Sequence, residues 1–232
     1  MKGTVDLVIA GAIIKDISMI QKAIDSAPKY EYEQKWIVFD GCPDKWNKSL
    51  KYQEYQAYKK YISNKYPEFI ITEETSNIYF REMMAHICDL SAADNLLVIQ
   101  DDVVLHELNL VDLMRQAAQK EDMKILCFPH REIPPEGTHW FSPIDDTWPL
   151  PFIKSHGWSE RVFLCSRVHI QNMINTSPKK SRQKLFIEAI YHAKMLSTSW
   201  KRMSDEEKEI YWQKWGCYFH YDILHTHLVG KR

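Results

Sequence analysis

The sequence predicts an α/β fold with a mostly parallel central sheet and helices on both of its faces. Apolar runs of strand length alternate with amphipathic helical segments over residues 1–130, and the run at residues 96–99 is apolar throughout. Such a pattern is typical of parallel sheets, whose strands are buried on both faces. At 232 residues, 45% of them hydrophobic, the chain has the size and composition of one globular domain.

The first part of the chain is predicted to alternate strands and helices. The predicted strands are residues 6–14, 35–40, 68–72, 96–99 and 124–128, and the predicted helices are residues 17–27, 47–66, 77–90 and 109–120. The helices are predicted from apolar residues spaced by three and four positions. Asp16 is expected to cap the first helix, and Pro28 and Pro67 are expected to end the first two.

The regular alternation ends after Pro129. Residues 130–151 are rich in Pro, Trp and acidic residues, and we expect a long loop over the open edge of the sheet. Ser204 and Glu207 form a capping box that predicts a helix ending near Gly216. The remaining predicted elements are strands at residues 158–166 and 217–224, and helices at residues 168–174 and 184–196.

Charge and cysteine content exclude several classes of protein. The formal net charge of -1 gives no general attraction to nucleic acid or anionic membranes. No apolar run approaches the roughly 20 residues of a membrane helix, and the first residues lack the pattern of a signal peptide. The five cysteines are scattered without a CxxC pair, which favours reduced thiols. We therefore expect a soluble cytoplasmic protein.

Small and acidic residues close three of the predicted strands. They are Ala10-Gly11, Asp40-Gly41 and Gln100-Asp101-Asp102. Because ligands bind at the carboxyl ends of the strands in such sheets, we expect these residues to converge on a nucleotide. Two adjacent carboxylates repel each other, and a divalent cation with phosphate oxygens would compensate their charge. The alternative is that Asp101 and Asp102 simply end a strand in solvent.

Two common nucleotide-binding motifs are missing from the sequence. There is no GxGxxG segment and no GxxxxGK[ST] loop. Both a dinucleotide-binding enzyme and a phosphate-loop enzyme are therefore disfavoured.

This order of elements, with an Asp closing the second strand and an acidic pair closing the central one, resembles GT-A glycosyltransferases of the DXD type. The resemblance implies a Rossmann-like GT-A fold, a nucleotide-sugar donor, and Mn²⁺ or Mg²⁺ as cofactor. By resemblance, Asp102 binds the metal, Asp101 approaches the ribose, and Asp40 contacts the nucleobase or ribose. Arg81 opens the helix that in many members passes beside the nucleotide.

The C-terminal tail extends the resemblance. His227, Gly230 and Lys231 are similar to the H-x-x-G segment of the glycogenin-like branch, where the histidine binds the metal and a nearby lysine holds the diphosphate. This implies that His227 is a second metal ligand and that Lys231 contacts the diphosphate. The chain departs from that branch in two places, because Gln100 replaces the first acid and Lys231 directly follows Gly230. The stereochemistry of transfer therefore stays open.

The predicted reaction moves a sugar from a nucleotide-diphosphate sugar, with a UDP-sugar favoured, to a hydroxyl acceptor. We expect one domain over residues 1–232, in which residues 1–130 bind the nucleotide and residues 131–232 supply the acceptor side and the metal-binding tail. If transfer inverts configuration, a carboxylate must deprotonate the acceptor hydroxyl. The candidate bases are Asp145, Asp146 and Glu188, and the aromatic candidates for acceptor contact are Trp140 and Trp148.

Two other classes of function fit the same residues. A metal-dependent nucleotidyltransferase would also use the acidic pair, but it would transfer phosphate. A non-catalytic sugar- or protein-binding module would keep the fold without metal-dependent nucleotide binding. The acceptor of a glycosyltransferase could be a glycan, a protein or a modified base, and the charge gives no indication of nucleic acid.

Overall fold

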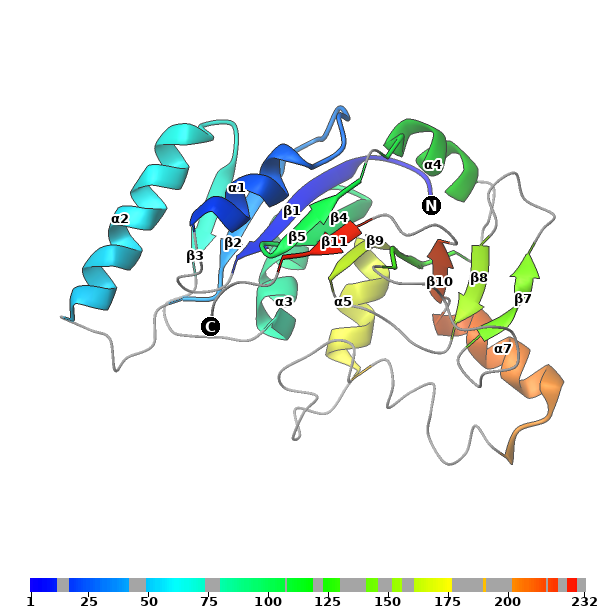
Figure 1. Cartoon of the computed structure of the whole chain (residues 1–232). Coiled ribbons are helices and arrows are strands. Elements are labelled where there is room, and N and C mark those ends of the chain that lie inside the picture. Colours follow the sequence, from blue (N-terminus) through cyan, green and yellow to red (C-terminus); the bar gives the residue numbers. More distant parts are fainter. Residues whose placement is uncertain are drawn as a thin grey trace.

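In the part of the chain that the structure describes, the strands form one nine-stranded sheet and one two-stranded sheet (Figure 1). The structure is a computed structural model, and its described residues are 1–11, 17–41, 49–73, 80–106, 108–118, 123–129, 141–145, 152–155, 161–176, 190, 202–215, 217–220 and 225–228. The strand order of the large sheet is β3-β2-β1-β4-β9-β6-β10-β8-β7. Its strands are β1 (Val5–Gly11), β2 (Lys35–Phe39), β3 (Ile70–Glu73), β4 (Asn95–Gln100), β6 (Ile125–Cys127), β7 (Phe141–Asp145), β8 (Phe152–Ser155), β9 (Val162–Ser166) and β10 (Cys217–His220).

The large sheet is mostly parallel, as predicted. β3, β2, β1 and β4 are parallel to their neighbours. β9 is antiparallel to both β4 and β6, so β6 points in the same direction as β4. β10 is parallel to β6, whereas β8 is antiparallel to β10 and to β7. Among the strands described, only β8 and β9 therefore run against the common direction.

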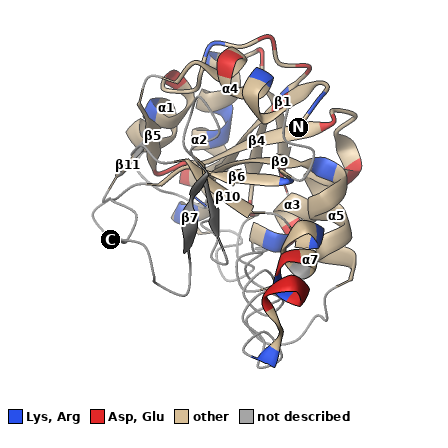
Figure 2. Ribbon diagram, turned by 90° about the vertical axis from the view of Figure 1, so that its right-hand side faces the viewer, with Lys and Arg blue, Asp and Glu red and all other residues tan. Residues whose placement is uncertain are grey.

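Helices cover both faces of this sheet. They are α1 (Ile17–Asp25), α2 (Leu50–Lys65), α3 (Phe80–Leu90), α4 (Leu110–Ala117), α5 (Arg167–Asn175) and α7 (Asp205–Trp215). In the view of Figure 2, α1 lies on one side of the strands, and α3 and α5 lie on the other. Leu96, Leu97, Val98 and Ile99 in β4 are each 0% exposed, which confirms a central strand buried on both faces.

Local sequence signals set the start of two helices. The side chain of Ser49 accepts a hydrogen bond from the N–H of Tyr52 at 3.4 Å, so α2 begins at Leu50, later than the predicted residue 47. The capping box is confirmed at the start of α7. The N–H of Ser204 donates to Glu207 Oε2 at 2.7 Å, and the N–H of Glu207 donates to Ser204 Oγ at 3.2 Å.

The loop predicted over residues 130–151 is wrong in part, because it contains the edge strand β7. β7 carries Pro143 and pairs with β8, with a register shift between Phe141 and Ile144. An edge strand tolerates proline because one side of it needs no ladder donors. The strand predicted at residues 158–166 is present as β9, but its antiparallel position between β4 and β6 was not predicted.

Several predicted elements extend beyond the described residues, two of them by four residues or more, and Asp16, the expected cap of the first helix, also lies outside the described residues. Of the helix predicted at residues 184–196, the structure describes only Ile190, which is helical and buried. Of the strand predicted at residues 217–224, it describes β10 but not residues 221–224. None of the helices in the described part combines the length and apolar character that crossing a membrane requires.

Candidate functional site

The carboxyl ends of β1, β2 and β4 lie together at one edge of the large sheet. β1 lies between the other two strands and is parallel to both. The N–H of Asp101 donates to the carbonyl oxygen of Ala10 at 3.0 Å, and the N–H of Asp40 donates to the carbonyl oxygen of Gly11 at 3.2 Å. Asp40 and Asp101 therefore flank the end of β1. The structure brings these four predicted site residues together.

Two glycines shape this edge of the sheet. Gly41, directly after Asp40, has a φ of 80°, in the left-handed region that favours glycine. A Cβ added at Gly11 would lie 3.1 Å from Cδ1 of Phe39. The absence of a side chain at Gly11 therefore lets the Phe39 ring pack against the end of β1. This packing role accounts for Gly11 independently of its predicted nucleotide contact.

The acidic pair forms the turn between β4 and β5 (Val103–Leu105). The N–H of Gln100 donates to the carbonyl oxygen of Arg161 at 2.9 Å, so regular hydrogen bonding continues up to the residue before the pair. Asp101 is 2% exposed, and Asp102 is half-buried. Asp101 is therefore not a strand end in solvent, because a carboxyl group at this depth requires polar or charged partners.

The C-terminal segment returns to the acidic pair and forms a small second sheet with β5. β11 (His225–His227) is antiparallel to β5, with His227 opposite Val103. The N–H of Leu228 donates to the carbonyl oxygen of Asp102 at 2.7 Å. Figure 1 shows the two short strands side by side in front of the central strands. The backbone of residue 227 thus lies directly beside the residue that follows Asp102.

Two further contacts hold this small sheet in place. Nε2 of His106 lies 2.9 Å from Oγ1 of Thr226, which links the two chain segments through their side chains. The N–H of Leu105 donates to Oγ of Ser26 at 3.0 Å, directly after α1. The small sheet is therefore attached to the residue that directly follows α1 as well as to the turn at Asp102.

Arg81 has a structural contact that the sequence did not predict. It is 3% exposed, and its Nη2 donates to the carbonyl oxygen of Ile174 at 2.9 Å. This bond joins the first turn of α3 to the end of α5. The nucleotide contact implied for Arg81 stays a prediction.

Asp145, a candidate base, closes the edge strand β7. Four strands, β9, β6, β10 and β8, lie between β4 and β7 in the sheet. At about 4.8 Å between neighbouring strands, five steps correspond to roughly 24 Å along the sheet. The sheet therefore does not bring the backbone of Asp145 close to the acidic pair.

Several predicted site residues lie outside the part of the chain that the structure describes. They are Asp146, Glu188, Lys231, Trp140 and Trp148, together with the side chains of Asp145 and His227. Among the side chains that are described, no three His, Cys, Asp or Glu residues gather closely enough to hold a metal. The candidate donors at this edge are the two carboxylates of the turn and His227 on the neighbouring strand.

Sequence reasoning missed β5 and the side-chain link between His106 and Thr226. The signal for β5 was available, because Val103, Val104 and Leu105 continue a β-forming run after the acidic pair. Nothing in the sequence indicates that His106 and Thr226 meet. They lie 120 residues apart, and only the pairing of β11 with β5 brings them together.

The fold is similar to that of a known enzyme structure. A crystal structure of GalNAc-T7 with UDP, GalNAc and Mn²⁺ matches 98% of this chain with a TM-score of 0.61 and 9% sequence identity. The chain spans 44% of the length of that structure. No protein-family model matches the sequence. No curated protein matches it. At this level of identity the similarity shows the fold alone, and the predicted GT-A type of α/β fold is confirmed.

Proposed function

We propose that this protein is a metal-dependent glycosyltransferase that moves a sugar from a nucleotide-diphosphate sugar, with a UDP-sugar favoured, to a hydroxyl acceptor. The observation that carries the proposal is the pairing of β11 with β5. It brings the backbone of His227 next to the turn that contains Asp101 and Asp102. The backbones of two aspartates and a histidine therefore lie close together at the carboxyl edge of the sheet, where α/β folds bind their ligands.

The donor types at this edge fit a divalent cation. Carboxylate oxygens are preferred by Mg²⁺ and Mn²⁺, and imidazole is also a common ligand of transition metals. In this proposal Asp102 and His227 hold the metal and Lys231 meets the diphosphate. A cation bound here would neutralise negative charge on the departing nucleoside diphosphate.

The remaining residues of the edge are proposed to hold the nucleotide. Asp101 and Asp40 flank the end of β1 and offer acceptors for ribose and nucleobase donors. Ala10 and Gly11 are proposed to contact the nucleotide through the backbone at the end of β1, with the Phe39 ring packed beside Gly11. In this proposal the residues at the carboxyl ends of β1, β2 and β4 orient the nucleotide-sugar donor.

The acceptor side is proposed to supply a general base and aromatic contacts. A reaction that inverts configuration needs a carboxylate to remove the proton of the acceptor hydroxyl. Glu188, Asp145 and Asp146 are the proposed bases. Asp145 closes β7 at the far edge of the sheet and Asp146 directly follows it in the chain, so Glu188 is the preferred candidate. Trp140 and Trp148 are proposed to contact the acceptor.

A thermal-shift screen tests the donor and the metal together. UDP-, GDP- and dTDP-sugars are each added with and without Mn²⁺, and the melting temperature is recorded. A ligand at about 100 times its Kd stabilises the fold by roughly 2.7 kcal/mol, which corresponds to about 8 °C for a chain of this size. The proposal predicts such a shift for at least one nucleotide sugar, and only with the metal.

A matched pair of variants assigns this shift to the acidic pair. Asp102→Asn should abolish the Mn²⁺-dependent shift and leave unfolding in urea nearly unchanged. Asp205→Asn removes a fully exposed carboxylate in the first turn of α7 and should behave like the wild type. A full shift in Asp102→Asn would remove Asp102 from the site, and no shift with any nucleotide sugar would overturn the proposal.

Product analysis separates sugar transfer from nucleotidyl transfer. The similarity of the fold to GalNAc-T7, crystallised with UDP and GalNAc, favours a nucleotide sugar as donor. Incubation with a nucleotide sugar and a pool of hydroxyl acceptors should release the nucleoside diphosphate. Release of pyrophosphate from a nucleoside triphosphate would favour a nucleotidyltransferase instead.

A further inference from the structure

A cavity lies at the amino ends of β1, β2 and β3, away from the acidic pair. Its volume is about 350 Å³, and its lining includes Leu7, Lys35 and Phe69 from the starts of these strands. From Leu7 to Gly11 the strand advances four residues, or about 13 Å at the usual rise. The cavity therefore lies about 13 Å from the carboxyl edge, measured along β1.

The walls of this cavity are rich in aromatic rings. Tyr30, Tyr32, Tyr66 and Phe69 all line it. Tyr30 and Tyr32 are half-buried, pack against the core, and have ring centroids 5.3 Å apart at an interplanar angle of 56°. The rings of Tyr66 and Phe69 meet edge to face at 6.2 Å. Tyr30 and Tyr32 thus offer fixed ring surface that solvent, and a small molecule, can reach.

Hydrogen bonds fix the aromatic residues in place. The hydroxyl of Tyr32 donates to the carbonyl oxygen of Pro28 at 2.9 Å. The hydroxyl of Tyr66 donates to Oδ1 of Asp25 at 3.1 Å. The first bond lies within the segment between α1 and β2, and the second joins the end of α1 to the end of α2. A ligand would meet a wall that is already ordered, which lowers the entropy lost on binding.

The charged groups around the cavity balance each other. Asp25 and Glu68 supply two carboxylates, and Lys29 and Lys35 supply two ammonium groups. The carboxylates would repel an anionic ligand, and the lysines would repel a cationic one. The face of the Phe69 ring is also occupied, because Nζ of Lys35 lies 5.7 Å from its centroid. The lining therefore favours a neutral ligand that both donates and accepts hydrogen bonds.

We propose that this cavity is a carbohydrate-binding site, separate from the nucleotide site, that takes a neutral pyranose unit. A pyranose presents an apolar C–H face that stacks on aromatic rings and a rim of hydroxyls that pair with carboxylates and ammonium groups. The volume is at the lower end of the range for small-molecule pockets, which suits one or two sugar units. This site does not depend on sugar transfer by the protein.

Saturation-transfer NMR tests the proposal directly. The probes are the methyl glycosides of glucose, galactose, N-acetylglucosamine and N-acetylgalactosamine, together with maltose and lactose. No metal and no nucleotide are added. At least one sugar should receive saturation at the ring protons of its apolar face, with the same signal in Asp102→Asn as in the wild type.

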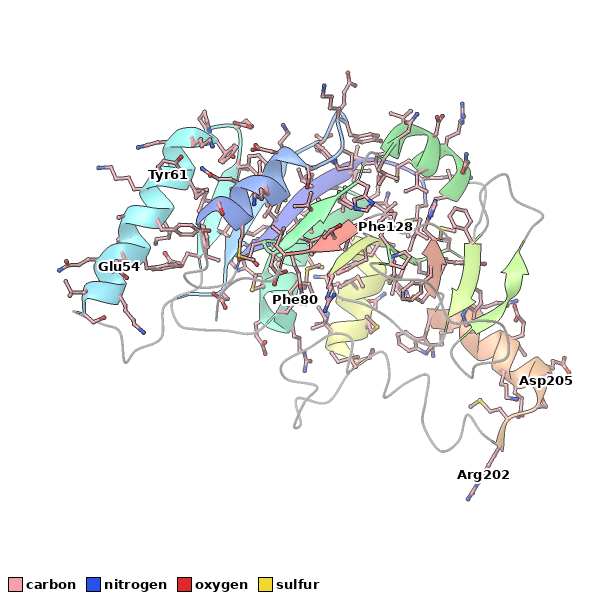
Figure 3. The ribbon with its side chains drawn as sticks, viewed as in Figure 1. Glu54, Tyr61, Phe80, Phe128, Arg202 and Asp205 are labelled. Carbon is pink, nitrogen blue, oxygen red and sulfur yellow. The ribbon has the colours of Figure 1, made fainter. Side chains whose placement is uncertain are left out.

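The matched variants are Tyr30→Leu and Tyr61→Leu. Tyr30→Leu keeps an apolar side chain and removes the ring, so Kd for the sugar should rise about tenfold, the loss typical of one stacking contact. Tyr61 projects from α2, is 45% exposed, and is not among the residues lining the cavity (Figure 3). Tyr61→Leu should bind the sugar like the wild type.

Ring labelling keeps the test independent of how the variants fold. In wild-type protein with ¹³C-labelled tyrosine rings, sugar titration should shift the Tyr30 and Tyr32 resonances. Absence of saturation for every sugar, unchanged binding in Tyr30→Leu, or loss of binding in Asp102→Asn would each overturn the proposal. The nucleotide thermal shift is a separate measurement, so failure of one site does not imply failure of the other.

Discussion

Asp6 is predicted to be one of the most sensitive positions for stability, because it joins three chain segments at the amino edge of the sheet. The residue is 0% exposed. Its Oδ1 accepts a hydrogen bond from the N–H of Gln34 at 2.8 Å, directly before β2. Its Oδ2 accepts from Nε1 of Trp36 at 2.8 Å and from Oγ of Ser91 at 2.7 Å, directly after α3. Asp6→Ala would remove all of these acceptors.

The expected loss follows from the donors that remain. A buried donor without a partner costs about 1–3 kcal/mol. The Ser91 hydroxyl can rotate to another acceptor, and the N–H of Gln34 is only partly buried. The indole N–H of Trp36 is buried and its direction is fixed. Counting Trp36 in full and Gln34 in part gives a loss of about 3 kcal/mol in the free energy of unfolding.

Urea unfolding, followed by far-UV circular dichroism, measures this loss. The control is Asp94→Ala, which removes an exposed carboxylate at the same edge that accepts from the N–H of Thr4 at 3.0 Å. We expect the control to lose less than about 1 kcal/mol, because water replaces the lost acceptor. If Asp6→Ala is no less stable than this control, the buried carboxyl group is not the link that the hydrogen bonds suggest.

Three more predictions can be tested on the purified protein. Leu228→Pro removes the N–H that donates to the carbonyl oxygen of Asp102, so the free energy of unfolding should fall by about 1 kcal/mol. The same variant should weaken Mn²⁺-dependent nucleotide binding in the thermal-shift assay, whereas Leu228→Ala should keep that binding. Gly3→Ala should destabilise the fold in urea by about 1–2 kcal/mol, because Gly3 has a φ of 96° and its new Cβ would overlap Oδ2 of Asp94. This cost should be smaller when Asp94 is alanine, and an equal cost in both backgrounds would attribute it to backbone strain alone. Burial raises the pKa of the Cys88 thiol to about 12, so iodoacetamide at pH 8 should modify Cys88 only after the protein unfolds. Peptide mass spectrometry would record the modification, and alkylation of Cys88 in the folded protein would contradict the prediction.

The sequence was most informative where the determining interactions are local. The apolar run of β4, the capping box at Ser204 and the small and acidic strand ends at Gly11 and Asp40 each depend on a few neighbouring residues. Parallel strands also place their carboxyl ends at one edge, so the convergence of those ends with Asp101 follows from the alternation of elements alone.

The remaining features depend on contacts between distant segments. Periodicity does not encode strand direction, so the antiparallel insertion of β9 between β4 and β6 was not predictable from its apolar pattern. β7 was missed because Pro143 disrupts the pattern that identifies a strand. The tail was expected near the metal site by resemblance, but its register against β5 depends on hydrogen bonds that span more than a hundred residues.

The pairing of β11 with β5 also determines when, during synthesis, the acidic turn formed by Asp101 and Asp102 can acquire β11 as its neighbouring strand. His106 and Thr226 are 120 residues apart in the chain. At about 5–20 residues per second, the ribosome makes Thr226 roughly 6–24 seconds after His106. The strands around Asp101 therefore leave the ribosome long before their last partner does, and contacts of such separation form slowly. A nascent chain that stalls before residue 225 carries the acidic turn without the strand that pairs beside it.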